Sequence, residues 1–332
     1  MPALVAFLIG MFVLQDGHAQ SQNVAVFNFK RADSIAALYP DHSITNLRGL
    51  SQKLTSPLKT EPEKFRAIFK WVCDNISNDY SLFTTNKKKR ETLSGDALRN
   101  WNQAFNATII EKLTKEHKTV CTGYAYLIRE LAHNAGLSCE IVNGYGRNAV
   151  ANIGGTGVLN HSWNAVQLDN KWYLCDATWA SGAIDSQQKK FVHNYNDLYF
   201  LTDPAQFIRN HYPQEVRWAL IDDHPSLHEF LNAPLAYPAA IREHFYADDD
   251  HFEVMLQKGA RLTLSFEGPP GLNKNLSMAI GDSRLQIQPQ LQSVADDRCQ
   301  YRLSQAFYFK GSYAVHVLLK DEYLYSYRVV VR

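Results

Sequence analysis

The stretch Thr119-Val120-Cys121-Thr122-Gly123-Tyr124-Ala125-Tyr126 decides the fold that this sequence predicts. Apolar residues continue after Cys121 at the spacing of one face of an amphipathic helix, and they are Tyr124, Ile128, Leu131, Ala132 and Ala135. Thr119 is the expected N-cap, and Gly136 stands where a C-cap glycine is expected. Cys121 would then lie among unpaired N–H groups of the first turn, which favour a thiolate and could hold an oxyanion. A buried structural cysteine is the alternative.

Two strand-like segments further along the chain supply partners for this cysteine. Residues 162–168 and 171–178 flank Asp169-Asn170, which is typical of a hairpin turn. With a two- or four-residue loop, Asp176 faces Trp163, and His161 shares a strand face with Trp163. His161 and Asp176 are then diagonal neighbours, with backbones roughly 7–8 Å apart, and a hydrogen bond can span that gap. Such a carboxylate would fix the imidazole tautomer and turn the other ring nitrogen toward the thiol. A three-residue loop would separate the two side chains.

At these residues the sequence resembles the transglutaminase-like superfamily, and within it the kyphoscoliosis-peptidase type of domain. The segments that carry the resemblance are 67–72 with Ile76 and Tyr80, 120–125, 142–145, 160–166, 171–179, and 199–204 followed by 211–213. The resemblance covers roughly residues 60–221. It implies an α+β, papain-like core, in which a cysteine-bearing helix packs on an antiparallel sheet. On the matching positions it implies a catalytic triad of Cys121, His161 and Asp176.

The sequence departs from one part of the superfamily. Val120-Cys121-Thr122 stands where animal transglutaminases have Gln-Cys-Trp, so neither their chemistry nor their calcium dependence is expected here. We predict no cofactor and no metal. A zinc site in particular is not expected, because none of the cysteines forms a Cys-x-x-Cys pair. The oxyanion partner upstream of Cys121 stays open; Trp101 is a candidate, with core packing as the alternative.

Aromatic and polar residues near the expected triad are candidates for substrate binding. We predict this role for Trp163, Asn164 and Tyr145. Asn164 as a plain polar residue of a strand is the alternative. The glycine-containing segment 147–159 precedes His161 and could border a substrate cleft, or it is an ordinary surface loop.

Composition and charge are those of an ordinary globular chain. The sequence has 332 residues, 45% of them hydrophobic, and a formal net charge of +1, so nothing indicates nucleic-acid binding. No apolar run reaches the roughly 18 residues of a transmembrane span. Residues 3–14 are apolar and precede Gly17-His18-Ala19, which predicts a secretory signal peptide cleaved near Ala19 and a secreted or periplasmic protein. Five cysteines leave one free thiol even if the others pair.

The chain divides by its residue patterns into five parts. We predict a signal peptide at 1–19, an N-terminal lead-in at 20–59, a transglutaminase-like catalytic domain at 60–221, a linker at 222–240 and a β-sandwich at 241–332. The catalytic domain starts with a capping box, Thr60 and Glu63. The basic run Lys87-Lys88-Lys89-Arg90 is expected in a solvated loop, with an acidic partner as the alternative. Short alternating runs after residue 250 predict the sandwich.

These observations favour an exported cysteine enzyme that acts on amide or peptide carbonyls of a protein or peptide substrate. Its triad would form a thioester acyl-enzyme that passes to water, as in a peptidase or amidase, or to an amine, as in a transglutaminase. The alternative is a catalytically silent scaffold that binds a protein or glycan. The sequence leaves the acyl acceptor, the role of the C-terminal domain and the oligomeric state open.

Overall fold

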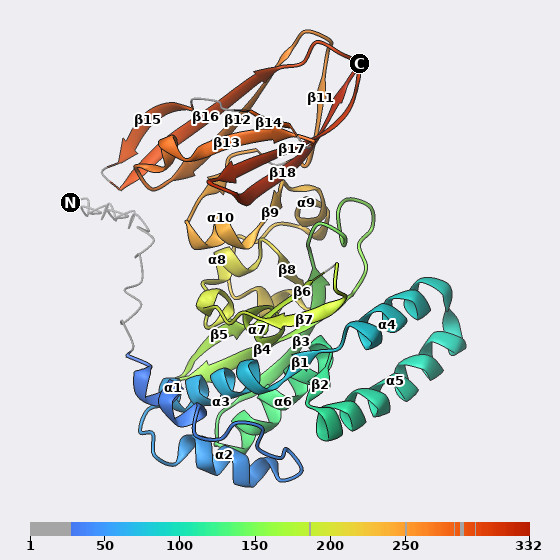
Figure 1. Cartoon of the computed structure of the whole chain (residues 1–332), viewed down its shortest axis with the longest axis vertical. Helices are drawn as coiled ribbons and strands as arrows, with labels where there is room; N and C mark the ends of the chain where they lie inside the picture. Colours follow the sequence, from blue (N-terminus) through green and yellow to red (C-terminus); the bar gives the residue numbers. More distant parts are fainter. Residues whose placement is uncertain (1–27, 186, 250, 282, 286–288, 296) are drawn as a thin grey trace, which may run out of the picture.

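The computed structural model describes residues 28–332 except 186, 250, 282, 286–288 and 296. Its first half consists of helices packed around one antiparallel sheet (Figure 1). The helices are α1 (Lys30–Ala36), α2 (Leu47–Thr55), α3 (Glu61–Asn75), α4 (Tyr80–Thr92), α5 (Gly95–Glu116) and α6 (Cys121–Asn134). The strand order is β5 (Lys171–Cys175), β4 (His161–Leu168), β3 (Cys139–Gly146) and β8 (His211–Pro213). Helix α6 packs on β3 and β4, so the expected cysteine-bearing helix lies on an antiparallel sheet.

Helix α3 connects the N-terminal segment to this core. It begins with the predicted capping box, in which the Thr60 side chain accepts from the Glu63 N–H and Glu63 accepts from the Thr60 N–H. Arg66 is buried and donates to Asp33, at 2.6 and 3.0 Å, and also to Asp197. These ion pairs connect α3 to α1 and to the 3-10 helix η1 (Asp197–Tyr199). Apolar residues of α1 and α2 belong to the same core as α3 and α6.

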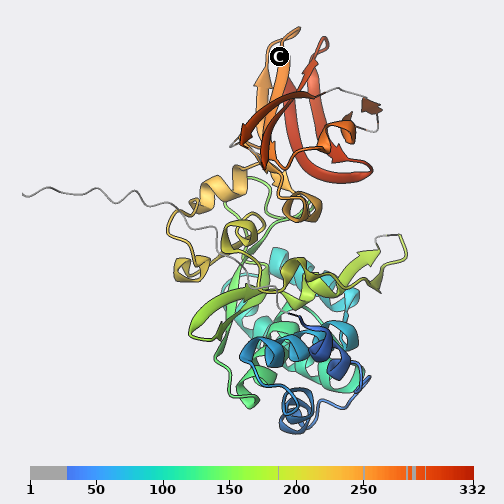
Figure 2. The same ribbon diagram turned by 90° about the vertical axis from the view of Figure 1, so that its left-hand side faces the viewer.

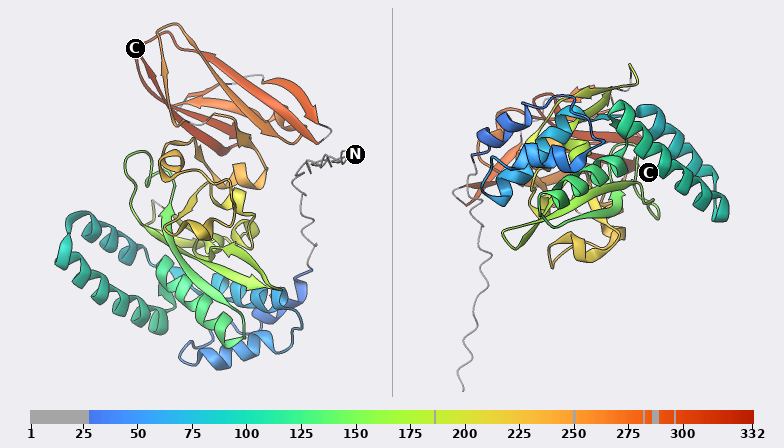
Figure 3. Two further views of the ribbon diagram at one scale, coloured as in Figure 1. Left: turned by 180° about the vertical axis from the view of Figure 1, so that it is seen from behind. Right: turned by 90° about the horizontal axis from the view of Figure 1, so that it is seen from below.

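Helices α4 and α5 form a hairpin that extends away from the rest of the molecule (Figures 1 and 3). The basic run Lys87-Lys88-Lys89-Arg90 lies on α4 and is exposed, so its predicted loop structure is wrong while its predicted solvation is confirmed. A small apolar cluster near the base of the hairpin contains Phe105, Ile109 and Val120, the residue just before Cys121.

The β4–β5 hairpin has the register that the turn pair predicts. Leu168 pairs with Lys171 and Asn164 pairs with Cys175. Asp169 and Asn170 have φ values of 49° and 64°, which a two-residue turn of this kind requires. Asp176 follows β5 directly and caps helix α7 (Ala177–Ser181), which fixes its backbone next to the start of β4.

Several shorter elements complete this half. Strand β1 (Ser77–Asn78) pairs in parallel with β2 (Lys118–Thr119), and β6 (Gly182–Asp185) pairs with β7 (Lys190–His193). The remaining helices are α8 (Pro204–Phe207), η2 (Val216–Ala219), α9 (Leu227–Asn232) and α10 (Pro238–Arg242). The segment predicted as a linker, 222–240, therefore contains regular structure. Its β9 (Leu235–Ala236) pairs with the last strand of the chain.

The C-terminal part is rich in strands, as predicted, and forms two antiparallel-rich sheets (Figure 2). One sheet has the order β10 (Tyr246–Ala247), β12 (Arg261–Gly268), β16 (Arg298–Ala306) and β15 (Gln290–Ala295). The other has the order β11 (Glu253–Leu256), β18 (Glu322–Val331), β17 (Gly311–Leu319), β13 (Leu276–Ile280) and β14 (Ser283–Leu285), with β9 added to β18; η3 (Leu272–Lys274) precedes β13. A core of its own includes Phe245, Phe266 and Tyr301.

The predicted signal peptide, residues 1–19, lies outside the described residues, and the domain boundaries stay predictions. Among the helices of the described chain, none has the length and apolar character needed to cross a membrane.

Candidate active site

Cys121 lies in the first turn of α6, as predicted, and is its first residue. The N-cap, however, is Val120 and not Thr119, and no side chain caps this helix end. Thr119 instead belongs to β2, where its buried Oγ1 has no hydrogen-bond partner among the described residues. It lies against Gly123: a Cβ at residue 123 would stand 1.8 Å from the Thr119 oxygen. Only glycine fits at this position, so the first turn can come close to β2. At the other helix end Gly136 follows the C-cap with a φ of 78°.

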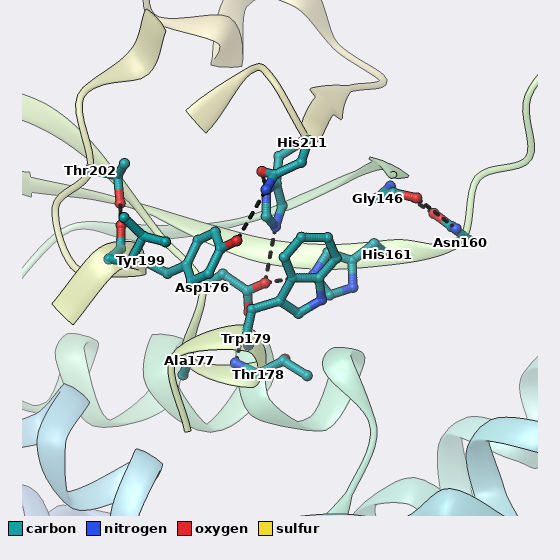
Figure 4. Close-up of polar contacts among 12 residues, drawn as sticks. Gly146, Asn160, His161, Asp176, Ala177, Thr178, Trp179, Tyr199, Thr202 and His211 are labelled. Carbon is teal, nitrogen blue, oxygen red and sulfur yellow. Dashed lines mark hydrogen bonds and ion pairs between the residues drawn. The ribbon is translucent and has the colours of Figure 1, made fainter. Parts of the chain in front are cut away.

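His161 and Asp176 meet at the point where the hairpin register predicts it. His161 Nε2 donates to Asp176 Oδ2 at 2.7 Å, and both side chains are buried (Figure 4). Asp176 Oδ1 accepts from the N–H groups of Thr178 at 2.7 Å and Trp179 at 3.3 Å, because Asp176 is also the N-cap of α7. The carboxylate is thus held by a helix end on one side and by the imidazole on the other.

The Cys121 thiol is half-buried, and His161 lies close enough to influence its pKa. Burial by itself raises the pKa of Cys121, but the hydrogen bond and charge of His161 and a backbone hydrogen bond at Ser162 outweigh it, and the pKa is lowered. For His161 burial has the opposite effect and lowers the pKa, but the charge and hydrogen bond of Asp176 raise it to about 10. The pKa of Asp176 lies well below its usual range, since the two histidines more than offset its burial. At neutral pH these directions favour a thiolate–imidazolium pair.

A further histidine, His211, was not predicted as a site residue. It lies on β8, and its Nε2 is 3.0 Å from the same Asp176 oxygen that accepts from His161 (Figure 4). Burial lowers the pKa of His211 to about 4. In the sequence, residues 211–213 are marked only by the family resemblance. No local pattern indicates that β8 pairs with the edge of β3 and so reaches Asp176.

The predicted substrate-binding residues have different surroundings. Trp163 and Asn164 are each 1% exposed. Asn164 donates to the carbonyls of Ala125, at 3.0 Å, and Glu140, at 3.2 Å, and so joins α6 to the sheet. This burial favours a supporting role for both residues over the predicted substrate contact. Tyr145 is half-buried, and its substrate contact stays a prediction.

Trp101, the candidate oxyanion partner, lies in the α4–α5 hairpin. Its ring stacks on Phe105 at a centroid distance of 5.5 Å, and its indole nitrogen donates to Asn86 at 3.0 Å. With its only polar hydrogen used in this way, packing is the better account of Trp101.

One cluster in the described chain has the residue types of a metal site. The ligand atoms of His161, Asp176 and His211 lie within 4.8 Å of one another. The two nitrogen–oxygen distances, 2.7 and 3.0 Å, are those of ordinary hydrogen bonds, which already account for the arrangement.

Comparison with known proteins relates part of this chain to one superfamily. Residues 48–177 match the family model described as the transglutaminase-like superfamily. Human kyphoscoliosis peptidase is 34% identical over 218 residues, which are 64% of this chain and 30% of that protein. Hillarin of Drosophila melanogaster is 25% identical over 237 residues, which are 68% of this chain and 26% of that protein. This chain therefore corresponds to less than a third of the length of either relative.

Among solved structures, one described as the crystal structure of a TGase aligns with a TM-score of 0.30. The sequence identity is 18%, and the alignment covers 54% of this chain and 40% of the other. A similarity of this size supports no inference about function.

Proposed function

We propose that this chain is a cysteine enzyme acting on amide or peptide carbonyls, and the match of residues 48–177 to the transglutaminase-like family model supports this proposal. The observation that carries the proposal is the hydrogen bond of 2.7 Å between His161 and Asp176, beside a cysteine at the start of α6. Cys121 would be the nucleophile, His161 the acid and base, and Asp176 the residue that orients the imidazole. The name of the human relative, a peptidase, is in keeping with this chemistry.

The first half of the reaction forms a thioester. The Cys121 sulfur attacks the carbonyl carbon, and the carbonyl electron pair moves onto the oxygen. The first turn of α6 lacks a side-chain cap, so its N–H groups are suited to hold this oxyanion. His161 donates to Asp176 from Nε2, which leaves Nδ1 for the thiol. The imidazolium then gives its Nδ1 proton to the leaving nitrogen as the C–N bond breaks, and His161 becomes neutral.

The second half releases the acyl group. Neutral His161 takes a proton from a water molecule or an amine as that molecule attacks the thioester carbonyl, and the C–S bond breaks to restore the thiolate. Water gives a carboxylic acid and an amine gives a new amide. Both outcomes use the same residues, so the proposal covers a peptidase or amidase and an acyltransferase.

We further propose that the protein is exported, on the pattern of residues 1–19. N-terminal sequencing of the protein recovered outside the cell should give a chain that starts near Gln20. A chain that keeps Met1 would contradict export and leave the enzymatic proposal unaffected.

A thiol-directed amide warhead tests the nucleophile. We expect labelling of the native chain at Cys121, loss of labelling in Cys121→Ala, and unchanged labelling in Cys73→Ala. Cys73 is a matched control because it is fully buried on α3 and its burial raises its pKa. When the native chain turns over p-nitrophenyl acetate, an acetyl-enzyme should form at Cys121, and mass spectrometry should detect it. Equal labelling of Cys121→Ala and native chain would leave the catalytically silent scaffold as the better account.

A further inference from the structure

Asp176 accepts more hydrogen bonds than orienting one imidazole requires. Its Oδ1 accepts two N–H groups of α7, and its Oδ2 accepts from His161 at 2.7 Å and faces His211 Nε2 at 3.0 Å. A carboxylate oxygen only accepts, so both imidazoles have to donate to Oδ2. His211 comes from β8, which pairs with β3 at the edge of the sheet. The carboxylate of the proposed triad is therefore shared between two histidines from different strands.

Aromatic rings enclose the His211 side chain. Phe207 stacks on it at a centroid distance of 4.2 Å, Trp179 lies at 4.4 Å, Trp163 at 5.2 Å and Tyr199 at 5.6 Å. Its side chain is 0% exposed. A cationic imidazolium has little to stabilise it in this enclosure, because the positive charge of His161 opposes the attraction of Asp176. His211 is therefore neutral at neutral pH, in agreement with the direction of its pKa.

A neutral His211 has one proton, and the carboxylate requires it on Nε2. Its Nδ1 is then an acceptor. The structure places Asn210 Oδ1 2.6 Å from this nitrogen and has Asn210 Nδ2 donate to the Tyr199 hydroxyl at 3.0 Å, so an acceptor Nδ1 requires the amide to be flipped. The amide serves this tautomer when its NH₂ group faces His211 and its oxygen accepts from Tyr199. Either orientation fills the same volume. The groups that titrate or carry charge around His211 are thus Asp176, His161 and Tyr199.

We infer that His211 is a positioning residue of this site, which keeps Asp176 ionised and fixed while His161 is neutral. The inference rests on the proposed function. After His161 gives its proton to the leaving group, the buried Asp176 has lost its cationic partner, and burial then favours a protonated carboxyl. If Asp176 took the Nε2 proton, His161 could stay neutral only by carrying a proton on Nδ1, where it could then no longer accept one. The Nε2–H donor of His211 and the two N–H donors of α7 stabilise the carboxylate through this step.

Two substitutions separate hydrogen bonding from packing. His211→Phe keeps a flat ring in the aromatic enclosure but removes the donor, and His211→Gln keeps an N–H donor of similar reach. His316→Phe is the matched control: His316 lies on β17 of the C-terminal region, and its Nδ1 is 2.5 Å from the Ser326 hydroxyl. The rate of iodoacetamide alkylation at Cys121 is measured from pH 4 to 10, together with p-nitrophenyl acetate turnover.

We expect His211→Phe to move the acid limb of the alkylation profile to higher pH. Turnover should fall roughly 10- to 100-fold, since a hydrogen bond to a charged group is worth about that factor in an equilibrium. His211→Gln should recover most of the native alkylation profile and most of the turnover. His316→Phe should match the native chain in both measurements. A folded His211→Phe chain with the native profile overturns the inference. If the rate of Cys121 alkylation does not depend on His161, the proposed function is contradicted instead.

The native chain offers a test that does not depend on the folding of a variant. Nitrogen-15 imidazole spectra should show His211 with its proton on Nε2 at pH 7 and should show no second protonation above pH 5. A proton found on Nδ1 with a bare Nε2, or a doubly protonated His211 at pH 7, would overturn the inference.

Discussion

Replacing Asp176 by Asn tests the site most directly, because it removes one charge and changes almost no volume. In the native chain Oδ1 caps α7 and Oδ2 faces two imidazole nitrogens. The amide oxygen of Asn can still cap α7, and its NH₂ group then faces the two rings. Since the NH₂ group only donates, His161 has to accept at Nε2 and carry its proton on Nδ1, toward the thiol. In this tautomer His161 cannot take up the thiol proton.

The size of the effect follows from the pKa of His161. Its rise from 6.5 to about 10 corresponds to about 5 kcal/mol net in favour of the imidazolium, in which the contributions of Asp176 and Cys121 outweigh the opposing effect of burial. Without the carboxylate, burial lowers the pKa of His161, and the thiol loses the cation that favours its ionisation. A thiol with its ordinary pKa of 9.0 is only about 1% ionised at pH 7. We therefore expect alkylation of Cys121 at pH 7 to fall roughly 100-fold and turnover to fall ~10³- to 10⁴-fold.

The sign of the pH dependence can be followed in the same experiment. Because the pKa of Cys121 is lowered, fast alkylation should extend well below the ordinary thiol pKa. As pH rises, the thiolate–imidazolium pair should persist until His161 deprotonates at about 10. In Asp176→Asn the rate should rise only as the thiol itself ionises, near or above pH 9. Mass spectrometry of Cys121 at each pH gives the profile. Asp79→Asn is the control, because Asp79 is also a buried N-cap with a cationic partner, Lys112.

One result would refute this reasoning. If Asp176→Asn folds, as judged by circular dichroism and its urea midpoint, and alkylates Cys121 with the native pH profile, then the carboxylate does not control the charge of His161. A loss of stability shared with Asp79→Asn would not count against it, because both variants weaken a cap.

Three further substitutions probe the supports of the site. Gly123→Ala places a methyl group 1.8 Å from the Thr119 oxygen, so we expect a loss of about 1–3 kcal/mol from overpacking and slower alkylation of Cys121, measured by urea unfolding and mass spectrometry. Asn164→Leu removes the buried amide that donates to the carbonyls of Ala125 and Glu140, which should cost about 1–3 kcal/mol in urea unfolding. Arg147→Met removes a buried guanidinium that donates to the carbonyls of Asn152 and of residues 233 and 234, and limited proteolysis should then cut faster within residues 148–158.

Each of these substitutions has a matched comparison. Thr119→Ala in the Gly123→Ala chain removes the closest contact and should restore part of the stability; no restoration would show that the clash lies elsewhere. Asn134→Leu, at an exposed position of α6, should be nearly neutral, and a cost equal to that of Asn164→Leu would argue against the buried hydrogen bonds. Arg129→Met, at a half-exposed arginine, should leave proteolysis unchanged. Native proteolysis in Arg147→Met would show that this arginine does not hold the loop.

The sequence predicted the parts of the site that depend on local rules. Helical spacing after Cys121 predicted α6, and the capping box predicted the start of α3. The turn pair Asp169-Asn170 was the most informative signal, since its conformation sets the register of β4 and β5. The cap of α6 was predicted one residue early, because a polar side chain at Thr119 is a normal capping signal, whereas the chain uses that residue in β2.

What the sequence determined by itself was the pairing of His161 with Asp176, because a two-residue turn leaves a hairpin one register and strand alternation then fixes the faces. Only the tertiary structure decided that His211 joins the same carboxylate and that Asn164 holds α6 on the sheet. These contacts join segments 35 and 39 residues apart. They depend on which strand pairs with the edge of β3 and how closely a helix packs on β4, and no spacing within either segment encodes that choice.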